Sequence, residues 1–205
     1  MVLQQEMTRM RLLLALALTT APAIAFAAGS VSDDSAAEAE PKQAPKVEGV
    51  ETNPPVETET VTECEDGQVF DQESFECVAA QDEALNDAER LQAVRELAYA
   101  GKFGAAQIVL DAVTDQDHDM VHTYRGFTAR KMGDMDAAMR AYGRALDINP
   151  DNILVRSYMG QAFVETGQYE LAQAQLTQIR TRGGRGTWAE ISLRLAIQSG
   201  TTYNY

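Results

Sequence analysis

Two short amphipathic helices joined by a tight turn are predicted for residues 124–150, where apolar side chains recur with the spacing of one helical face. The same pattern of small and large apolar residues returns 34 residues later, over residues 160–179. The matching positions are Gly126 and Gly160, Ala129 and Phe163, Gly133 and Gly167, Met135 and Tyr169, Ala138 and Ala172, and Tyr142 and Leu176. A fixed period of this size is typical of stacked helical repeats, in which neighbouring units bury each other's apolar faces.

A degenerate third copy precedes these two, over residues 91–113. It is offset by 32 residues rather than 34, so its connecting loop, Thr114–Asp117, is two residues shorter. Val94 replaces the small glycine, which predicts a looser helix crossing in this copy. Each copy has a glycine at the end of its first helix, where glycine takes the left-handed cap conformation at little cost. These glycines are Gly101, Gly133 and Gly167.

One more amphipathic helix is predicted for residues 188–197, after a flexible basic loop at residues 180–186. A stack of helix pairs leaves an apolar face at its end, and a closing helix covers that face. The side chains expected to pack there are Trp188, Ile191, Leu195 and Ile197. The loop lacks the Lys-Ser/Thr ending of a phosphate-binding loop, so we interpret it as a connector.

Residues 1–28 have the layout of a secretory signal peptide. A basic flank precedes an unbroken apolar run at residues 12–18, and small residues stand at the two positions that a signal peptidase recognises. We expect cleavage after Ala27 or Ala28, which places the mature protein in the periplasm or outside the cell. The alternative is an uncleaved anchor, but the apolar stretch is at the short limit for spanning a bilayer.

Residues 29–62 are predicted to form a disordered, acidic, proline-rich linker, because they hold too few large apolar residues to offset the entropy of ordering. The acidity of the chain is concentrated in residues 29–81, which hold 14 acidic and two basic residues. Such a segment repels phosphates and anionic lipids, so neither nucleic acid nor stable membrane insertion after cleavage is expected. We interpret the linker as a solvated spacer; the alternative is an acidic tether for a basic partner.

Residues 63–79 contain both cysteines of the chain and predict a small β-hairpin held by a Cys64–Cys77 disulfide. Two short strands flank a turn at residues 71–74. So short a segment builds no core alone, and closing a loop of this size contributes about 3 kcal/mol. A metal or redox pair is poorly supported, because the segment has neither a C-x-x-C spacing nor a histidine.

The two clear copies, residues 119–152 and 153–180, resemble the tetratricopeptide repeat. The resemblance rests on the small residues at the helix crossings, the large residues facing the next repeat, and the proline that closes the first copy: Gly126, Gly160, Ala138, Ala172, Tyr142, Leu176 and Pro150. It implies an all-α, right-handed solenoid of three helix pairs plus a capping helix over residues 84–199. Residues 200–205 are then a C-terminal tail.

The resemblance also implies a concave groove that binds an extended or helical peptide of another protein. The residues expected to line it are Arg95, Tyr99, Tyr124, Phe127, Arg130, Lys131, Tyr158 and Gln161, with Leu91, Ser157 and Glu165 beside them. Aromatic rings beside basic side chains suit anchor residues and carboxylates of a ligand. The alternative is that Tyr124, Phe127 and Tyr158 only pack between helices.

His118 and His122 are four residues apart among three aspartates, a spacing that can place two imidazoles on one helical face as a metal site requires. The simpler interpretation is that Asp117 or Asp119 caps the helix. There is no H-E-x-x-H or G-x-S-x-G motif, so no metal, cofactor or catalytic residue is expected.

The sequence therefore predicts an exported, non-catalytic scaffold that binds another protein. Two alternatives stay open: a structural repeat protein that self-associates, and a metal-binding envelope enzyme that uses His118 and His122.

Overall fold

The computed structural model describes residues 53–202 of the 205-residue chain. Within that range the chain forms eight helices and one two-stranded sheet. In chain order the elements are α1 (Glu59–Thr62), β1 (Gln68–Asp71), β2 (Glu76–Ala79), α2 (Asp87–Tyr99), α3 (Phe103–Ala112), α4 (Asp119–Lys131), α5 (Met135–Ile148), α6 (Ile153–Glu165), α7 (Tyr169–Thr181) and α8 (Trp188–Ser199). The predicted signal peptide, the predicted linker up to residue 52 and residues 203–205 lie outside the described residues.

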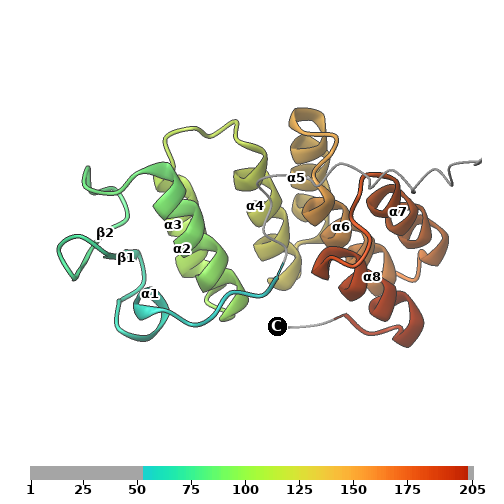
Figure 1. The fold of residues 1–205 in the computed structure, drawn as a ribbon, viewed down its shortest axis with the longest axis horizontal. Helices are drawn as coiled ribbons and strands as arrows, with labels where there is room; N and C mark the ends of the chain where they lie inside the picture. The colour runs from blue at the N-terminus through green and yellow to red at the C-terminus, as the bar shows by residue number, and fades with distance from the viewer. Residues whose placement is uncertain (1–52, 203–205) are drawn as a thin grey trace, which may run out of the picture. The chain divides into compact units, whose positions relative to one another are not determined.

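The helices pack as three consecutive pairs, α2 with α3, α4 with α5, and α6 with α7 (Figure 1). The first helices of successive pairs also contact each other, α2 with α4 and α4 with α6. Helix α8 packs against both helices of the last pair. The predicted stack of three helix pairs and a closing helix is therefore confirmed. None of the helices between residues 53 and 202 is both long enough and apolar enough to cross a bilayer.

A glycine in the left-handed conformation ends the first helix of each pair, as predicted. The φ angles are 78° at Gly101, 91° at Gly133 and 73° at Gly167. In the second pair the amide after the glycine, that of Asp134, donates to the Ala129 carbonyl at 2.9 Å. The corresponding hydrogen bond closes the other two first helices, which is the Schellman arrangement. The chain can thus reverse within three residues and start the second helix.

Helix α6 belongs to two apolar cores at once. Leu154 and Tyr158 pack into the core that extends over the first two helix pairs. Ile153 and Val164 pack into a second core with α7 and α8. Because its two sides are covered by different neighbours, α6 is buried almost all the way round.

The closing helix presents a different face to the stack than its sequence pattern predicts. Its buried residues are Ala189, Glu190, Ser192, Leu193 and Ala196. The predicted packing residues are only partly buried: Trp188, Ile191, Leu195 and Ile197. Of these, Ile197 packs against the core between α6, α7 and α8, as predicted. Leu193 explains the rotation, because it fills the space above Gly160, where an added Cβ would lie 2.5 Å from the leucine Cδ2.

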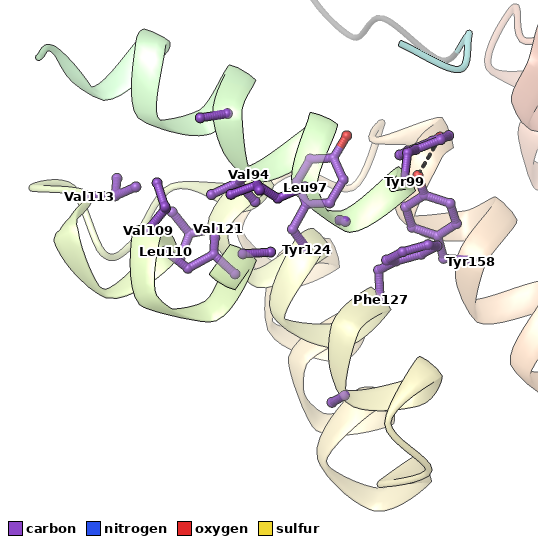
Figure 2. Packing of buried hydrophobic residues seen from close by; sticks show 14 of the residues in the cluster. Val94, Leu97, Tyr99, Val109, Leu110, Val113, Val121, Tyr124, Phe127 and Tyr158 are labelled. Atoms are coloured by element: carbon purple, nitrogen blue, oxygen red, sulfur yellow. Dashed lines mark hydrogen bonds between the residues drawn. The ribbon is translucent and has the colours of Figure 1, made fainter. Parts of the chain in front are cut away.

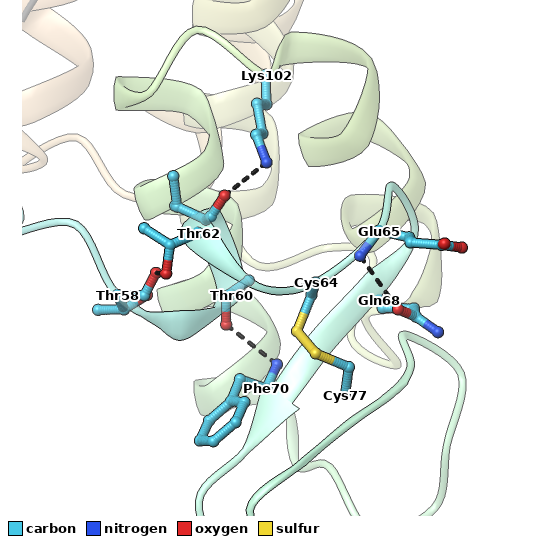
Figure 3. The surroundings of a disulfide bond; sticks show 10 residues. Thr58, Thr60, Thr62, Cys64, Glu65, Gln68, Phe70, Cys77 and Lys102 are labelled. Atoms are coloured by element: carbon cyan, nitrogen blue, oxygen red, sulfur yellow. Dashed lines mark hydrogen bonds between the residues drawn. A yellow bond between two sulfur atoms is a disulfide. The ribbon is translucent and has the colours of Figure 1, made fainter.

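Helix α1 lies inside the segment predicted to be a disordered linker, so that prediction is wrong for residues 59–62. Thr60 and Val61 are buried. The Thr60 hydroxyl oxygen accepts the Phe70 amide at 3.1 Å, and the Val61 carbonyl accepts from Lys102 Nζ at 2.6 Å (Figure 3). The average composition of the linker did not indicate that residues 59–62 contact both the hairpin and the helices.

The hairpin and its disulfide are present as predicted. Strands β1 and β2 pair antiparallel, and Cys64 and Cys77 are disulfide-bonded with Cα atoms 5.6 Å apart (Figure 3). The first strand runs one residue further than expected, to Asp71, whose carboxylate accepts the backbone amides of Glu73 and Ser74 at 3.1 Å. That carboxylate organises the turn, and the hydroxyl and amide donors lower its pKa.

Candidate functional site

Four aromatic rings from the three first helices meet in one cluster (Figure 2). The Phe127 ring centroid on α4 lies 5.9 Å from that of Tyr99 on α2 and 4.7 Å from that of Tyr158 on α6. The hydroxyls of Tyr99 and Tyr158 share a hydrogen bond of 2.7 Å. Tyr124 lies 6.4 Å from Tyr158 between centroids. These four residues, called here the aromatic cluster, join all three helix pairs.

The aromatic cluster is buried, and its most exposed member, Tyr99, is 8% exposed. Tyr124, Phe127 and Tyr158 thus pack between helices, which was the alternative derived from the sequence. Aromatic rings bury large areas, so the cluster contributes to the cohesion of the stack. A direct contact of these rings with a ligand stays a prediction.

Two cations lie against the Phe127 ring. The Arg130 side chain is fully buried, and its Nη1 donates to Glu165 Oε1 at 2.5 Å. Lys131 Nζ lies 5.7 Å from the Phe127 centroid, within cation–π range. Burial, and then the Arg130 charge, lower the pKa of Lys131 to about 8, while Glu165 acts in the opposite direction. An additional carboxylate beside Lys131 would favour its charged form.

Gln161 lies in the interior of the stack on α6, and its contact with a ligand stays a prediction. It is fully buried, and its Nε2 donates to Ser157 Oγ at 3.4 Å. The Ser157 hydroxyl in turn shares a hydrogen bond of 3.1 Å with Ser192 on α8. The closing helix therefore contacts α6 at Ser157, a contact that the pattern of a single repeat does not predict.

Arg95 on α2 connects the first helices to the segment that precedes α1. Its guanidinium carbon lies 6.0 Å from the Tyr99 ring centroid, and its Nη2 donates to the Asn53 carbonyl. Five residues later, Thr58 donates to the Glu96 carboxylate at 2.5 Å. Residues 53–58 therefore lie along α2, and they enclose a cavity with it. That cavity is lined by Pro54, Pro55, Val56, Glu57, Glu96, Tyr99 and Ala100.

A second cavity, of about 280 Å³, lies between the first and second helix pairs. It is lined by Ala98, Tyr99, Ala100, Gly101, Phe103, Phe127 and Lys131. Three of the predicted groove residues, Tyr99, Phe127 and Lys131, come together here. Phe103 was not among the predicted groove residues, because only first helices were expected to line the groove and Phe103 begins a second helix. Its position two residues after the turn glycine Gly101 could have indicated that it lies near the cavity. An aromatic lining with one cation suits an apolar side chain next to a carboxylate.

Comparison with protein families gives one match, to the model described as the tetratricopeptide repeat, over residues 129–184. Residues 129–184 therefore have the sequence pattern of tetratricopeptide repeats. The matched stretch covers α5, α6 and α7, and the first helix pair repeats their arrangement, including the glycine cap. The comparison with curated proteins found no match, and neither did the comparison with solved structures.

Tetratricopeptide repeats generally mediate protein–protein interactions, and the first helices of such stacks line an extended concave surface. In this chain α2 contacts α4 and α4 contacts α6, and that the side they form around Arg95, Tyr99, Phe127 and Lys131 is such a surface stays a prediction. This side is called here the first-helix face.

The two histidines have structural roles at the start of α4. His118 Nδ1 accepts the Met120 amide at 3.1 Å, so His118 itself caps α4 and the prediction of Asp117 or Asp119 was wrong. His122 Nε2 lies 4.0 Å from Asp117 Oδ1. Between residues 53 and 202, no three His, Cys, Asp or Glu side chains are close enough to hold a metal ion. Because His118 Nδ1 accepts the Met120 amide hydrogen, its lone pair is not available to bind a metal ion.

Proposed function

We propose that this protein is an exported, non-catalytic adaptor that binds a peptide or helix of a partner protein on its first-helix face. The observation that carries the proposal is the cavity between the first two repeats, where Tyr99, Phe103 and Phe127 surround space beside Lys131. Buried aromatic surface next to a cation is the composition of an anchor pocket. The repeats supply a rigid support for it, because α2, α4 and α6 are joined by the aromatic cluster.

Export is supported by two independent features. The first 28 residues have the three-part layout of a signal peptide. The hairpin carries a disulfide, and such bonds persist in oxidising compartments such as the periplasm or the extracellular space. Both features fit a protein that acts outside the cytoplasm.

The proposal is tested by capture of partners from envelope extract with wild type, Lys131→Glu and Arg140→Glu. Lys131 lines the cavity, whereas Arg140 is exposed on α5, a second helix, and provides the same charge change elsewhere. We expect a partner recovered by wild type and Arg140→Glu and lost with Lys131→Glu. Equal recovery by all three proteins would remove the first-helix face from the function.

Light scattering at several protein concentrations separates this proposal from self-association. A mass that stays that of one chain fits an adaptor for another protein. If the mass rises with concentration in wild type but not in Lys131→Glu, the partner is instead a second copy of this chain.

A further inference from the structure

We propose that two copies of this chain associate through the turn of the hairpin, with Phe75 of one copy inserted in a cavity between α3, α4 and α5 of the other. Residues 72–76 are called here the hairpin tip, and the cavity is called the notch. The contact goes beyond the proposed function, since it uses neither Lys131 nor the first-helix face. It gives the open alternative of self-association a defined pair of surfaces.

The hairpin tip carries an aromatic ring that its own chain leaves in solvent. Residues 72–76 are all exposed, and Phe75 is 74% exposed. Its φ angle is 60°, in the left-handed region that costs free energy in a residue with a side chain. Among the described residues other than glycine, Phe75 alone has a positive φ. Backbone strain combined with exposed aromatic surface indicates that the tip serves binding rather than folding.

The tip is held in one conformation before it meets a partner. The Asp71 carboxylate accepts the amides of Glu73 and Ser74 at 3.1 Å, and the Asp71 carbonyl accepts the Phe75 amide at 2.9 Å. The disulfide closes the hairpin two residues beyond Phe75. A preorganised anchor loses little conformational entropy on binding, so a single ring can contribute much of the contact.

The notch has a volume of about 270 Å³ and lies between the second helices α3 and α5, with α4 at its base. An apolar cavity of about 150 Å³ already holds a benzene molecule, so the notch has room for a phenylalanine ring. The space exists because most of its apolar lining residues are small. These residues are Leu110, Ala129, Ala137 and Ala141.

The next repeat shows which side chain occupies the equivalent space. Ala129 corresponds to Phe163, and Ala137 corresponds to Leu171, each 34 residues later. Phe163 packs against both cores of the stack. The chain therefore fills the junction between its second and third helix pairs with its own phenylalanine, whereas alanine stands at that position between the first and second pairs. A phenylalanine from another copy fits there.

Charge directs the hairpin tip to the notch rather than to another tip. Residues 63–79 hold six acidic and no basic residues, so two tips repel each other. Glu73 and Glu76 are exposed on either side of the aromatic ring. Arg125 lines the notch, and its ion pair with Asp111, at 3.0 Å, involves a carboxylate that is 75% exposed. An exposed pair contributes little stability, so Arg125 can bind a carboxylate of the incoming tip.

Sedimentation equilibrium of the full chain over a range of protein concentrations measures the association. The mass of wild type should rise above that of one chain. Phe75→Gly should raise the Kd of association at least about tenfold, because it removes one buried phenylalanine from the contact. Glycine takes a φ of 60° at little cost, so this variant should be at least as resistant to urea as wild type. The control Val56→Gly removes another apolar side chain, 84% exposed, and should associate like wild type.

The notch is tested by filling it. Ala137→Leu places there the side chain that the next repeat has at Leu171, and it should also raise the Kd at least about tenfold. The control Ala174→Leu makes the same change at an exposed position on α7 and should have no effect. An equimolar mixture of Phe75→Gly and Ala137→Leu should associate at a concentration at which neither does alone. The first variant supplies an intact notch and the second an intact tip.

The mass of one chain at every concentration would overturn the inference, and so would a mixture of the two variants that fails to associate. Association of Phe75→Gly or Ala137→Leu with the wild-type Kd would also overturn it. Loss of association in Lys131→Glu would place the contact on the first-helix face instead of the notch. The envelope capture experiment is independent, because Lys131→Glu keeps both the hairpin tip and the notch.

Discussion

Gly126 sets how closely helices α4 and α5 approach each other. A Cβ at this position would lie 2.4 Å from Tyr142 Cε1 and 3.1 Å from the Ala138 carbonyl oxygen. Tyr142 is fully buried, so its ring cannot simply move aside into solvent. The missing side chain is therefore a packing requirement rather than a need for backbone freedom.

Gly126→Ala is expected to lower the free energy of unfolding by about 1–3 kcal/mol, as overpacking of a filled core does. Gly143→Ala on the same helix pair should act in the opposite direction. Its Cβ meets nothing within 4 Å, and alanine stabilises a helix interior by roughly 0.5–1 kcal/mol over glycine. Urea denaturation measures the free energy of unfolding of both variants. Equal changes in the two variants would contradict the close helix crossing at Gly126.

His122 makes stability depend on pH. Burial, then Arg125 and Arg144, lower its pKa below the ordinary value, and Asp117 opposes them only in part. The unfolded chain therefore binds a proton that the folded one does not, and stability should fall as pH drops below about 6.5. Urea midpoints at pH 5 and pH 7.5 should differ less in His122→Gln than in wild type. An unchanged pH dependence in that variant would show that other groups cause it.

At the scale of elements, the hairpin is attached to the repeats at defined points. The Phe70 amide donates to Thr60 on α1, and Val69 and Leu85 belong to the core that α2 and α3 share. The disulfide restrains the ends of the hairpin, but the helix pairs have their own apolar contacts. Local opening of the hairpin should therefore be separable from unfolding of the stack.

Cys64→Ser with Cys77→Ser should destabilise the hairpin by about 3 kcal/mol on the loop-entropy estimate. Hydrogen exchange of the Phe70 amide should then accelerate about 100-fold, since each 1.4 kcal/mol is a factor of ten. Amides in α6 should keep their wild-type protection. Equal acceleration in α6 would mean that the hairpin and the repeats unfold as one unit.

At the scale of the whole molecule, α6 couples the two cores. Tyr158 completes the aromatic cluster of the first two repeats, and Ile153 and Val164 complete the core beneath α8. Neither core is closed without this helix. Stability should therefore depend on the complete stack, as in repeat proteins whose units bury their apolar faces on their neighbours.

Truncation after Pro150 removes α6, α7 and α8 and should abolish cooperative thermal unfolding, because Tyr124 and Phe127 lose their cover. Truncation after Gly200 removes only the tail and should preserve the melting transition. Circular dichroism at 222 nm follows both. Cooperative folding that survives the loss of everything after Pro150 would contradict the stacked-repeat architecture.

Much of the fold was predictable because it depends on local chemistry. The turn glycines take a conformation that other residues avoid, so Gly101, Gly133 and Gly167 mark the helix ends directly. The Cys64–Cys77 bond was predicted from two cysteines that are close in sequence in a chain expected to be exported. The candidate site was only partly predictable, since the resemblance to the tetratricopeptide repeat implied Tyr99, Phe127 and Lys131 but neither their burial nor the place of Phe103 beside them.

The sequence by itself determined the number of helix pairs, their boundaries and the hairpin, because periodicity, capping and covalent closure act within short stretches of chain. Only the tertiary structure decided that the aromatic cluster is buried, that Leu193 turns α8 over Gly160, and that residues 53–62 lie against α2. Each of these depends on which surfaces of distant segments fit together. How these surfaces fit depends on their shapes and on burial in the assembled stack, so it cannot be predicted from a short stretch of sequence.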